Sequence, residues 1–382
     1  MIPYGRQEIT QSDIDAVTQV LQSDFLTQGP MVPKFEKLVA NYCGVKYGVA
    51  TNSATSVLHI ACLALGLKEG DYLWTSPITF VASANCGLYC DAKVDFVDID
   101  PETYNLSPQA LEEKLIQAEK VNKLPKIIVA VHFAGQSCEM DKIYQLSQKY
   151  EFKIIEDASH AIGGKYKNQT IGSCKYSDIT VFSFHPVKII TTAEGGMAVT
   201  NSNKLADKML LLRSHGITRD TNLMTHKPDG GWYYQQIELG FNYRMNDIQA
   251  ALGASQMDRI DEYIEKRHNI AKKYSTALNG YPVTSQLQSN HMFSAYHLYV
   301  IRVKESQHKK IFSQLRNKSI SVNLHYIPIY RQPYYERFGY NKSDYPNAEN
   351  YYSQAITLPI YPTLSSSEQN KIIRTLKLLI KK

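Results

Sequence analysis

Seven short segments rich in β-branched and other apolar residues recur through the first half of the chain, separated by stretches of helix length. They are residues 47–50, 72–75, 94–98, 127–131, 152–155, 179–184 and 197–200. Strands that alternate with helices are typical of parallel sheets, because a parallel connection must cross back over the sheet. We therefore predict an α/β fold with a seven-stranded, mostly parallel sheet and helices on both faces.

The segments before and after these strands predict helices, a long loop and a second domain. Ser12 is predicted to begin a first helix, with Asp15 at the capping-box position, and a second helix follows at 33–42. Residues 213–240 are polar and aperiodic, which indicates a long functional loop. Asn246 can cap a helix whose apolar stripe runs on toward Leu278. Strands at 297–303 and 320–323 and a basic amphipathic C-terminal helix then predict a smaller α+β domain, dividing the chain into 1–245 and 246–382.

Composition narrows the class of protein. Lysine and arginine (42) exceed aspartate and glutamate (36) only slightly and are dispersed, so we expect no nucleic-acid partner. No apolar run approaches the roughly 20 residues that span a bilayer, and the first residues lack the apolar core of a signal peptide. We expect a cytoplasmic protein without a membrane partner. The six cysteines show no metal-ligand spacing, so we expect reduced thiols and no metal site.

The sequence Ser-Phe-His-Pro-Val-Lys at 183–188 follows a predicted strand and precedes Glu194 and a diglycine. The carboxyl end of such a strand is where α/β sheets hold ligands. An amine there, as on Lys188, can form a Schiff base with a carbonyl cofactor such as pyridoxal 5′-phosphate (PLP). A solvated surface lysine is the alternative.

Two further strand ends carry polar groups. Small hydroxyl residues at 51–56 precede a helix, where free amides and the helix dipole can bind a phosphate, although ordinary capping would use the same residues. Asp157 ends a buried-type strand, where a carboxylate needs a cationic partner. A protonated pyridine nitrogen would serve, as would a helix N-terminus. Phe80 could stack on a flat ring or belong to the core.

Three residues with weaker signals complete the candidate site. His160 could contact a cofactor ring or be an internal histidine. His325 and Tyr326 bring polar and aromatic groups to the edge of the predicted small domain. Glycine-rich nucleotide motifs, zinc-protease motifs and nucleophile elbows are absent from the sequence.

With Ser53-Ala54-Thr55, Phe80, Asp157, Ser183 and Lys188 in this order, the chain resembles the DegT/DnrJ/EryC1/StrS family of sugar aminotransferases. These are fold-type I PLP enzymes. The resemblance covers nearly the whole chain, from residues 26–29 through 213–216 and 240–246 to 358–359.

The resemblance implies roles for individual residues. Lys188 would form the internal aldimine with PLP, Asp157 would pair with the pyridine nitrogen, Phe80 would stack on the ring, and His160 would lie on its hydroxyl side. The phosphate would be held by Ser53, Ala54, Thr55 and Ser183, joined by Asn242 of a second subunit, which makes a homodimer with shared active sites. Positions near the sugar nucleotide are Thr27, Gly29, His325 and Tyr326.

The implied reaction is amino transfer from L-glutamate to a nucleotide-linked 4-keto-6-deoxy sugar. His160 stands where many relatives carry glutamine, which favours the pseudaminic acid branch and UDP-2-acetamido-2,6-dideoxy-β-L-arabino-hex-4-ulose as substrate. Three alternatives remain: an aminotransferase for another surface or spore-coat polysaccharide, a sugar dehydratase of the same fold, and a silent protein that senses PLP or a sugar nucleotide. Lys188 argues against the dehydratase, because those enzymes lack the lysine.

Overall fold

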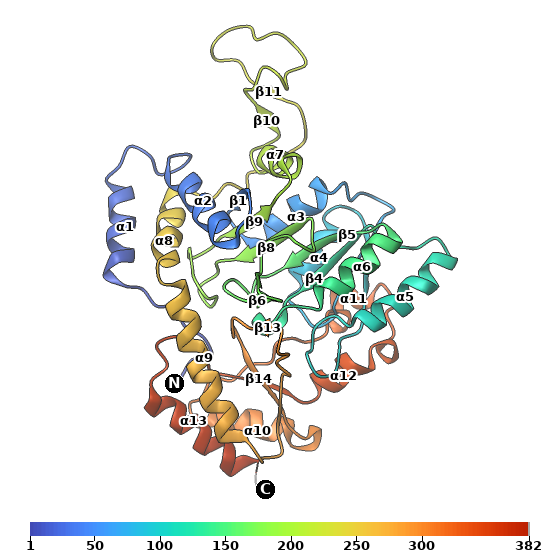
Figure 1. Ribbon diagram of the computed structural model, residues 1–382, viewed down its shortest axis with the longest axis vertical. Coiled ribbons are helices and arrows are strands. Elements are labelled where there is room, and N and C mark those ends of the chain that lie inside the picture. The colour runs from blue at the N-terminus through green and yellow to red at the C-terminus, as the bar shows by residue number, and fades with distance from the viewer. Residues whose placement is uncertain (381–382) are drawn as a thin grey trace.

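A seven-stranded sheet forms the centre of the protein. The computed structural model describes residues 1–380 (Figure 1). Its strands lie in the order β1-β9-β8-β5-β4-β2-β3, and β9 alone among them runs antiparallel to its neighbours. The strands are β1 Tyr47–Thr51, β2 Tyr72–Thr75, β3 Lys93–Phe96, β4 Ile127–Val131, β5 Lys153–Asp157, β8 Ile179–Ser183 and β9 Gly196–Thr200. The predicted α/β class and the seven-stranded, mostly parallel sheet are confirmed.

Helices cover both faces of this sheet, as predicted. Alternate residues of β4 point to opposite faces, so Val129 packs with α3, α4 and α7 while Ile128 packs with α5 and α6. Helices α2 and α8 cover the same side as α5 and α6, over β8 and β9. The bounds are α2 Met31–Cys43, α3 Ala54–Ala64, α4 Ala82–Leu88, α5 Pro108–Lys120, α6 Met140–Tyr150, α7 Asn203–Leu212 and α8 Asp247–Met257.

The first helix, α1 Gln11–Leu21, is capped two residues earlier than predicted. Thr10 caps it and forms a capping box with Asp13, so Ser12 and Asp15 do not have these roles. The Asp13 carboxylate is buried and accepts hydrogen bonds from Ser255 and Arg259, which turns this side of the helix toward α8. Ile14 and Leu21, apolar residues at helical spacing on this helix, are therefore exposed.

The predicted long helix after Asn246 is two helices. Asn246 caps α8 as expected, but the helix ends at Met257, and α9 Ile260–Leu278 starts after a break at 258–259. Helix α8 and the first turns of α9 share a core with the sheet, whereas the later turns of α9 pack with the C-terminal elements. The division between residues 245 and 246 therefore stays a proposal.

The C-terminal part is built around a three-stranded sheet in the order β12-β14-β15. The segment 320–323, predicted as a strand, makes only isolated bridges from Ile320 to Ile2 and from Asn323 to Thr357. The amphipathic C-terminal helix is confirmed. The elements are β12 Thr284–Ser285, β14 Tyr299–Arg302, α10 Glu305–Asn317, η2 Ile329–Arg331, α11 Pro333–Glu336, η3 Lys342–Asp344, α12 Pro346–Tyr352, β15 Ala355–Leu358 and α13 Ser366–Leu379.

The predicted loop at 213–240 forms a finger that projects from one end of the molecule (Figure 1). It holds a two-stranded ladder of β10 Ile217–Thr218 and β11 Gln235–Gln236. A last small sheet, in the order β13-β6-β7, packs through Tyr166 and Met292 on the core that α5 and α6 share with the large sheet. Its strands are β6 Lys165–Tyr166, β7 Gln169–Thr170 and β13 Met292–Phe293, and the turn η1 Phe133–Gly135 follows β4. Within residues 1–380, none of the helices is both long and apolar enough to cross a membrane.

Candidate active site

A cavity of about 560 Å³ opens where β1, β2, β4, β5 and β8 end. Because these strands are parallel, their carboxyl ends meet at one edge of the sheet, and the side chains that follow them converge there. The cavity gathers ten of the thirteen predicted site residues: Ser53, Ala54, Thr55, Phe80, Asp157, His160, Ser183, Lys188, His325 and Tyr326.

Lys188 lies in a tight bend that returns β8 into β9. The Phe184 amide donates to the Gly195 carbonyl (3.0 Å), and the Phe184 carbonyl accepts from the Thr192 amide (3.0 Å), which closes the bend. Gly195 and Gly196 supply space, since a Cβ at Gly196 would lie 2.5 Å from the Ala54 nitrogen. Burial lowers the pKa of the Lys188 amine to about 8, against the opposing charge of Asp157. A neutral, nucleophilic amine is therefore accessible near neutral pH.

Asp157 is the last residue of β5, and its carboxylate is buried and fixed from both sides. Ser83 donates its hydroxyl to one oxygen (2.7 Å), while Ser159 donates its amide (3.1 Å) and hydroxyl (2.5 Å) to the other. The carboxylate thus stays oriented toward a cavity that also holds Lys188. This geometry suits a carboxylate that pairs with a cation on a ligand.

The N-terminus of α3 forms a possible phosphate cradle. Ser53 caps this helix by accepting the Ser56 amide (3.1 Å). Ala54 and Thr55 hold the first two helical positions, where a helix offers its amides no internal acceptor. The dipole of α3 adds a partial positive charge there. Ser183 at the end of β8 completes the wall.

Aromatic and imidazole groups form the other walls. Phe80 is 57% exposed although it lies in the cavity, so a flat ligand could cover its ring. The His160 imidazole shares a hydrogen bond of 3.1 Å with the Tyr326 hydroxyl. Burial, and then the Lys188 charge, holds the pKa of His160 well below its usual value and lowers the pKa of His325 to about 3. Both imidazoles are therefore neutral at neutral pH.

The structure does not bring three predicted residues into this cavity. Thr27 is exposed, and Gly29 donates its amide to Asp247 (2.8 Å) at the start of α8. Asn242 is exposed at the base of the finger, bridged to Ser214. Their predicted contacts with nucleotide or phosphate remain proposals that need a second subunit or a bound ligand.

Sequence reasoning missed further residues that line the cavity, among them the polar residues Tyr4, Ser83, Glu194 and His297. Ser83 lies inside α4, and Tyr4 and His297 do not follow a strand of the large sheet, so the strand-end rule could not find them. Glu194 had a usable signal, because it precedes the diglycine of the bend that presents Lys188.

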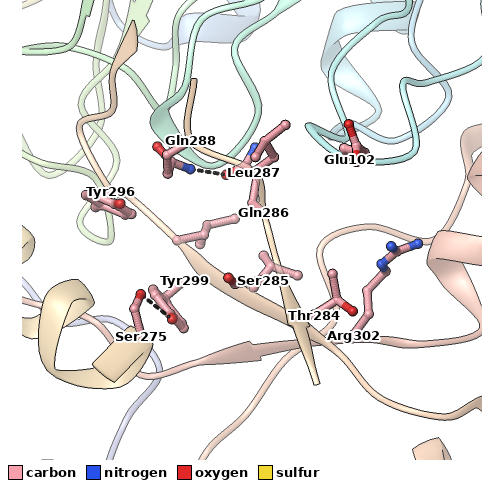
Figure 2. A pocket seen from close by; sticks show the side chains of 12 residues that line it. Glu102, Ser275, Thr284, Ser285, Gln286, Leu287, Gln288, Tyr296, Tyr299 and Arg302 are labelled. Carbon is pink, nitrogen blue, oxygen red and sulfur yellow. Dashed lines mark hydrogen bonds between the residues drawn. The ribbon is translucent and has the colours of Figure 1, made fainter. Parts of the chain in front are cut away.

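A second hollow of about 390 Å³ lies away from these strand ends, beside β12 and β14 (Figure 2). Its side chains are chiefly neutral and polar, as at Ser285 and Gln286, with Arg302 at one side. The lining contains no lysine among residues 1–380. It therefore offers no amine to a carbonyl cofactor.

The residues of the first cavity fit PLP. They provide an amine of lowered pKa in Lys188, a fixed buried carboxylate in Asp157, an exposed aromatic face in Phe80 and a helix N-terminus for a phosphate. The close approach of Gly196 to Ala54 leaves the amides of α3 at the cavity wall. Each group matches one chemical part of that cofactor.

Comparisons with known proteins agree with this chemistry. The chain is 38% identical over 387 residues to the UDP-4-amino-4,6-dideoxy-N-acetyl-beta-L-altrosamine transaminase of Campylobacter jejuni, covering 100% of this chain and 98% of the relative. It is 37% identical over 387 residues to the spore coat polysaccharide biosynthesis protein SpsC of Bacillus subtilis, covering 100% and 97%.

Solved structures give the same result. The sugar aminotransferase Spr1654 of Streptococcus pneumoniae, described as putative and solved in its PMP form, superposes with a TM-score of 0.91 at 29% identity, covering 99% of each chain. Helicobacter pylori PseC, an aminotransferase of pseudoaminic acid biosynthesis, superposes with a TM-score of 0.90 at 31% identity, also covering 99% of each.

The model of the DegT/DnrJ/EryC1/StrS aminotransferase family matches residues 7–377. This match and the identities over the full length confirm the expected enzyme class and PLP as its cofactor. The chain belongs to the DegT/DnrJ/EryC1/StrS aminotransferase family.

Proposed function

We propose that this sugar aminotransferase converts UDP-2-acetamido-2,6-dideoxy-β-L-arabino-hex-4-ulose to its 4-amino sugar in pseudaminic acid biosynthesis, with L-glutamate as amino donor. The single observation that carries the reaction type is the meeting of Lys188 and Asp157 in one cavity at the strand ends. The names of the C. jejuni and H. pylori relatives support the sugar and the pathway.

The residues divide the work of amino transfer. When bound, PLP supplies a carbonyl carbon that takes up the amino group and a ring that withdraws electrons. Lys188 carries protons to and from the reacting carbon, and its lowered pKa makes the neutral amine available. Asp157 holds a positive charge at the ring nitrogen, while the amides of α3 hold the phosphate and Phe80 covers the ring. A positioned proton carrier typically contributes about 10²–10⁴-fold to the rate.

A homodimer with shared sites is part of the proposal. The finger exposes large apolar side chains, with Trp232 at 76% and Leu239 at 77% exposure, and Asn242 lies exposed at its base. Exposed apolar groups on a projecting element are typical of contact surfaces. A second copy seated there would cover them and would receive Asn242 at its phosphate cradle.

A panel of 4-keto sugar nucleotides, incubated with the protein and L-glutamate, tests the substrate. We expect mass spectrometry to detect the aminated product from the UDP-linked N-acetyl sugar, and 2-oxoglutarate to form in equal amount. Lys188→Ala serves as the control for non-enzymatic amination. Amination of other sugars alone would contradict the pseudaminate assignment and leave the aminotransferase class intact.

The spore-coat alternative retains one supporting observation, the 37% identity to SpsC over the whole chain. The same panel separates it, because a spore-coat or other polysaccharide enzyme would prefer a different sugar or nucleotide. A silent sensor would release no 2-oxoglutarate with any member of the panel.

A further inference from the structure

His297 lies in the wall of the active-site cavity without a role in the mechanism above. It lies two residues before β14, the central strand of the C-terminal sheet, whereas His160 follows β5 of the large sheet. The two imidazole rings are nevertheless in contact, with centroids 4.4 Å apart and planes tilted by 42°. Both side chains are buried.

The backbone that carries His297 is fixed from two sides. The Arg267 guanidinium, buried in α9, donates to the carbonyls of Tyr296 (3.2 Å) and His297 (3.3 Å). On the other side, the Ala295 amide donates to the Gly135 carbonyl (2.9 Å). A Cβ at Gly135 would lie 3.0 Å from both the His160 carbonyl oxygen and the His297 nitrogen. This glycine therefore lets the two histidine backbones approach across η1.

The hydrogen bonds of the two rings are incomplete. His160 has a partner for Nε2 in the Tyr326 hydroxyl, but the Nδ1 atoms of His160 and His297 are both buried and have no partner among residues 1–380. A buried polar atom without a partner destabilises the folded state. A phenylalanine would fill the position of His297 without that cost, so an imidazole there indicates a role beyond packing.

Both rings are neutral in this surrounding. Burial comes first in holding the pKa of each histidine well below its usual value, and nearby positive charge adds to it. The groups that face the pair are Lys188, His325, Arg267 and the Tyr326 hydroxyl. A neutral imidazole carries its proton on one nitrogen only, so the orientation and tautomer of His160 depend on what its ring contacts.

We infer that His297 is a positioning residue that fixes the ring orientation and tautomer of His160, and through it the protonation equilibrium of the cofactor. This inference rests on the proposed placement of PLP between Asp157, Lys188 and His160. Since His297 lies just before β14, the central strand of the C-terminal sheet, the contact also links that part of the chain to the cofactor site.

The test is a double-mutant cycle on the purified holoenzyme, read as the pH midpoint of the cofactor's visible absorbance band. His297→Phe keeps a flat ring and removes both nitrogens. We expect it to shift the midpoint by about 0.5–1 pH unit. His160→Gln should also shift the midpoint. In the His160→Gln background His297→Phe should add nothing, because no imidazole remains to be positioned.

His268→Phe is the matched control. His268 stacks on Phe293 (4.3 Å) and bonds the Ser294 carbonyl (2.7 Å), so it supports the same segment but does not line the cavity. It should leave the midpoint unchanged. If His297→Phe does not fold, His297→Gln replaces it in the same cycle. An unchanged midpoint, or two shifts that add in the double variant, overturns the inference. A wild-type protein without any PLP band would instead overturn the proposed cofactor site.

Discussion

At the scale of single residues, the site depends on side chains that orient the Asp157 carboxylate by hydrogen bonds. The Asp157 carboxylate accepts from Ser83 on one oxygen and from Ser159 on the other. Ser83 comes from α4 and is the donor that sequence reasoning did not find. Its hydrogen bond can be removed by a single substitution that leaves β5 and the segment after it unchanged.

Ser83→Ala should lower kcat about tenfold, the equivalent of one charge-assisted hydrogen bond, while PLP content stays at the wild-type level. Steady-state kinetics and the absorbance of bound cofactor measure the two effects. Ser147→Ala removes a buried hydroxyl that bonds within α6, far from the cavity, and should change neither. An unchanged kcat in Ser83→Ala would show that Ser159 alone holds the carboxylate.

Lys188 makes the stability of the cofactor-free protein depend on pH. Burial lowers its folded pKa to about 8, below the usual value near 10.5. Between these values the unfolded chain binds the proton that the folded chain has lost, so stability rises with pH. Wild type should therefore gain on the order of 2–3 kcal/mol relative to Lys188→Met between about pH 8 and pH 10.5, and nothing below pH 8. Urea unfolding of both apo proteins across this range measures the difference, and a constant difference would contradict the buried-amine account.

At the scale of elements, the contact of β9 with the N-terminus of α3 shapes the phosphate cradle. A methyl group on Gly196 would lie 2.5 Å from the Ala54 nitrogen and 2.6 Å from its Cα, so the helix end would have to move. Gly196→Ala should raise the Kd of PLP at least about tenfold, because the amides leave their alignment. Ser147→Ala, which lies in α6 and outside the cavity, should bind PLP normally in the same fluorescence titration. Equal affinities would mean that the amides of α3 do not hold the phosphate.

Strand periodicity predicted the sheet well, because each strand is an apolar run bounded by turns. The strand-end rule then predicted Ser53, Asp157, Ser183 and Lys188 together, since parallel strands end at one edge. The strand-end rule could not predict residues that lie on helices or on the C-terminal part of the chain. His297 enters the cavity through tertiary contacts of Arg267 and η1, which leave no local pattern.

The same limit explains the errors in the helices. Thr10 caps α1 because its capping-box partner Asp13 is buried and bonds Ser255 and Arg259. These contacts join residues more than 200 positions apart. Likewise the apolar stripe after Asn246 continues through the break at 258–259, because both α8 and α9 present apolar faces to the protein. Periodicity alone does not register such a break.

At the scale of the whole molecule, one chain does not account for every predicted site residue. Asn242 is exposed at the base of the finger and lies outside the cavity of its own chain. The proposed homodimer resolves this by placing Asn242 at the phosphate cradle of the second copy. If the site is shared between two chains, two different inactive variants can complement each other in a mixed dimer. A site contained in one chain would not allow this.

Two inactive variants should restore activity when they form mixed dimers. Lys188→Ala removes the amine of its own chain, and Asn242→Ala removes the amide that the chain offers to its partner. In a mixed dimer one site combines both defects, and the other combines a wild-type lysine with a wild-type Asn242. Random pairing of equal amounts should return about a quarter of the wild-type activity, because half of the dimers are mixed and each has one intact site. Differently tagged subunits, unfolded together, refolded and assayed, measure the recovery. If Asn242 served its own chain, every site would keep a defect and the mixture would stay as inactive as its parents.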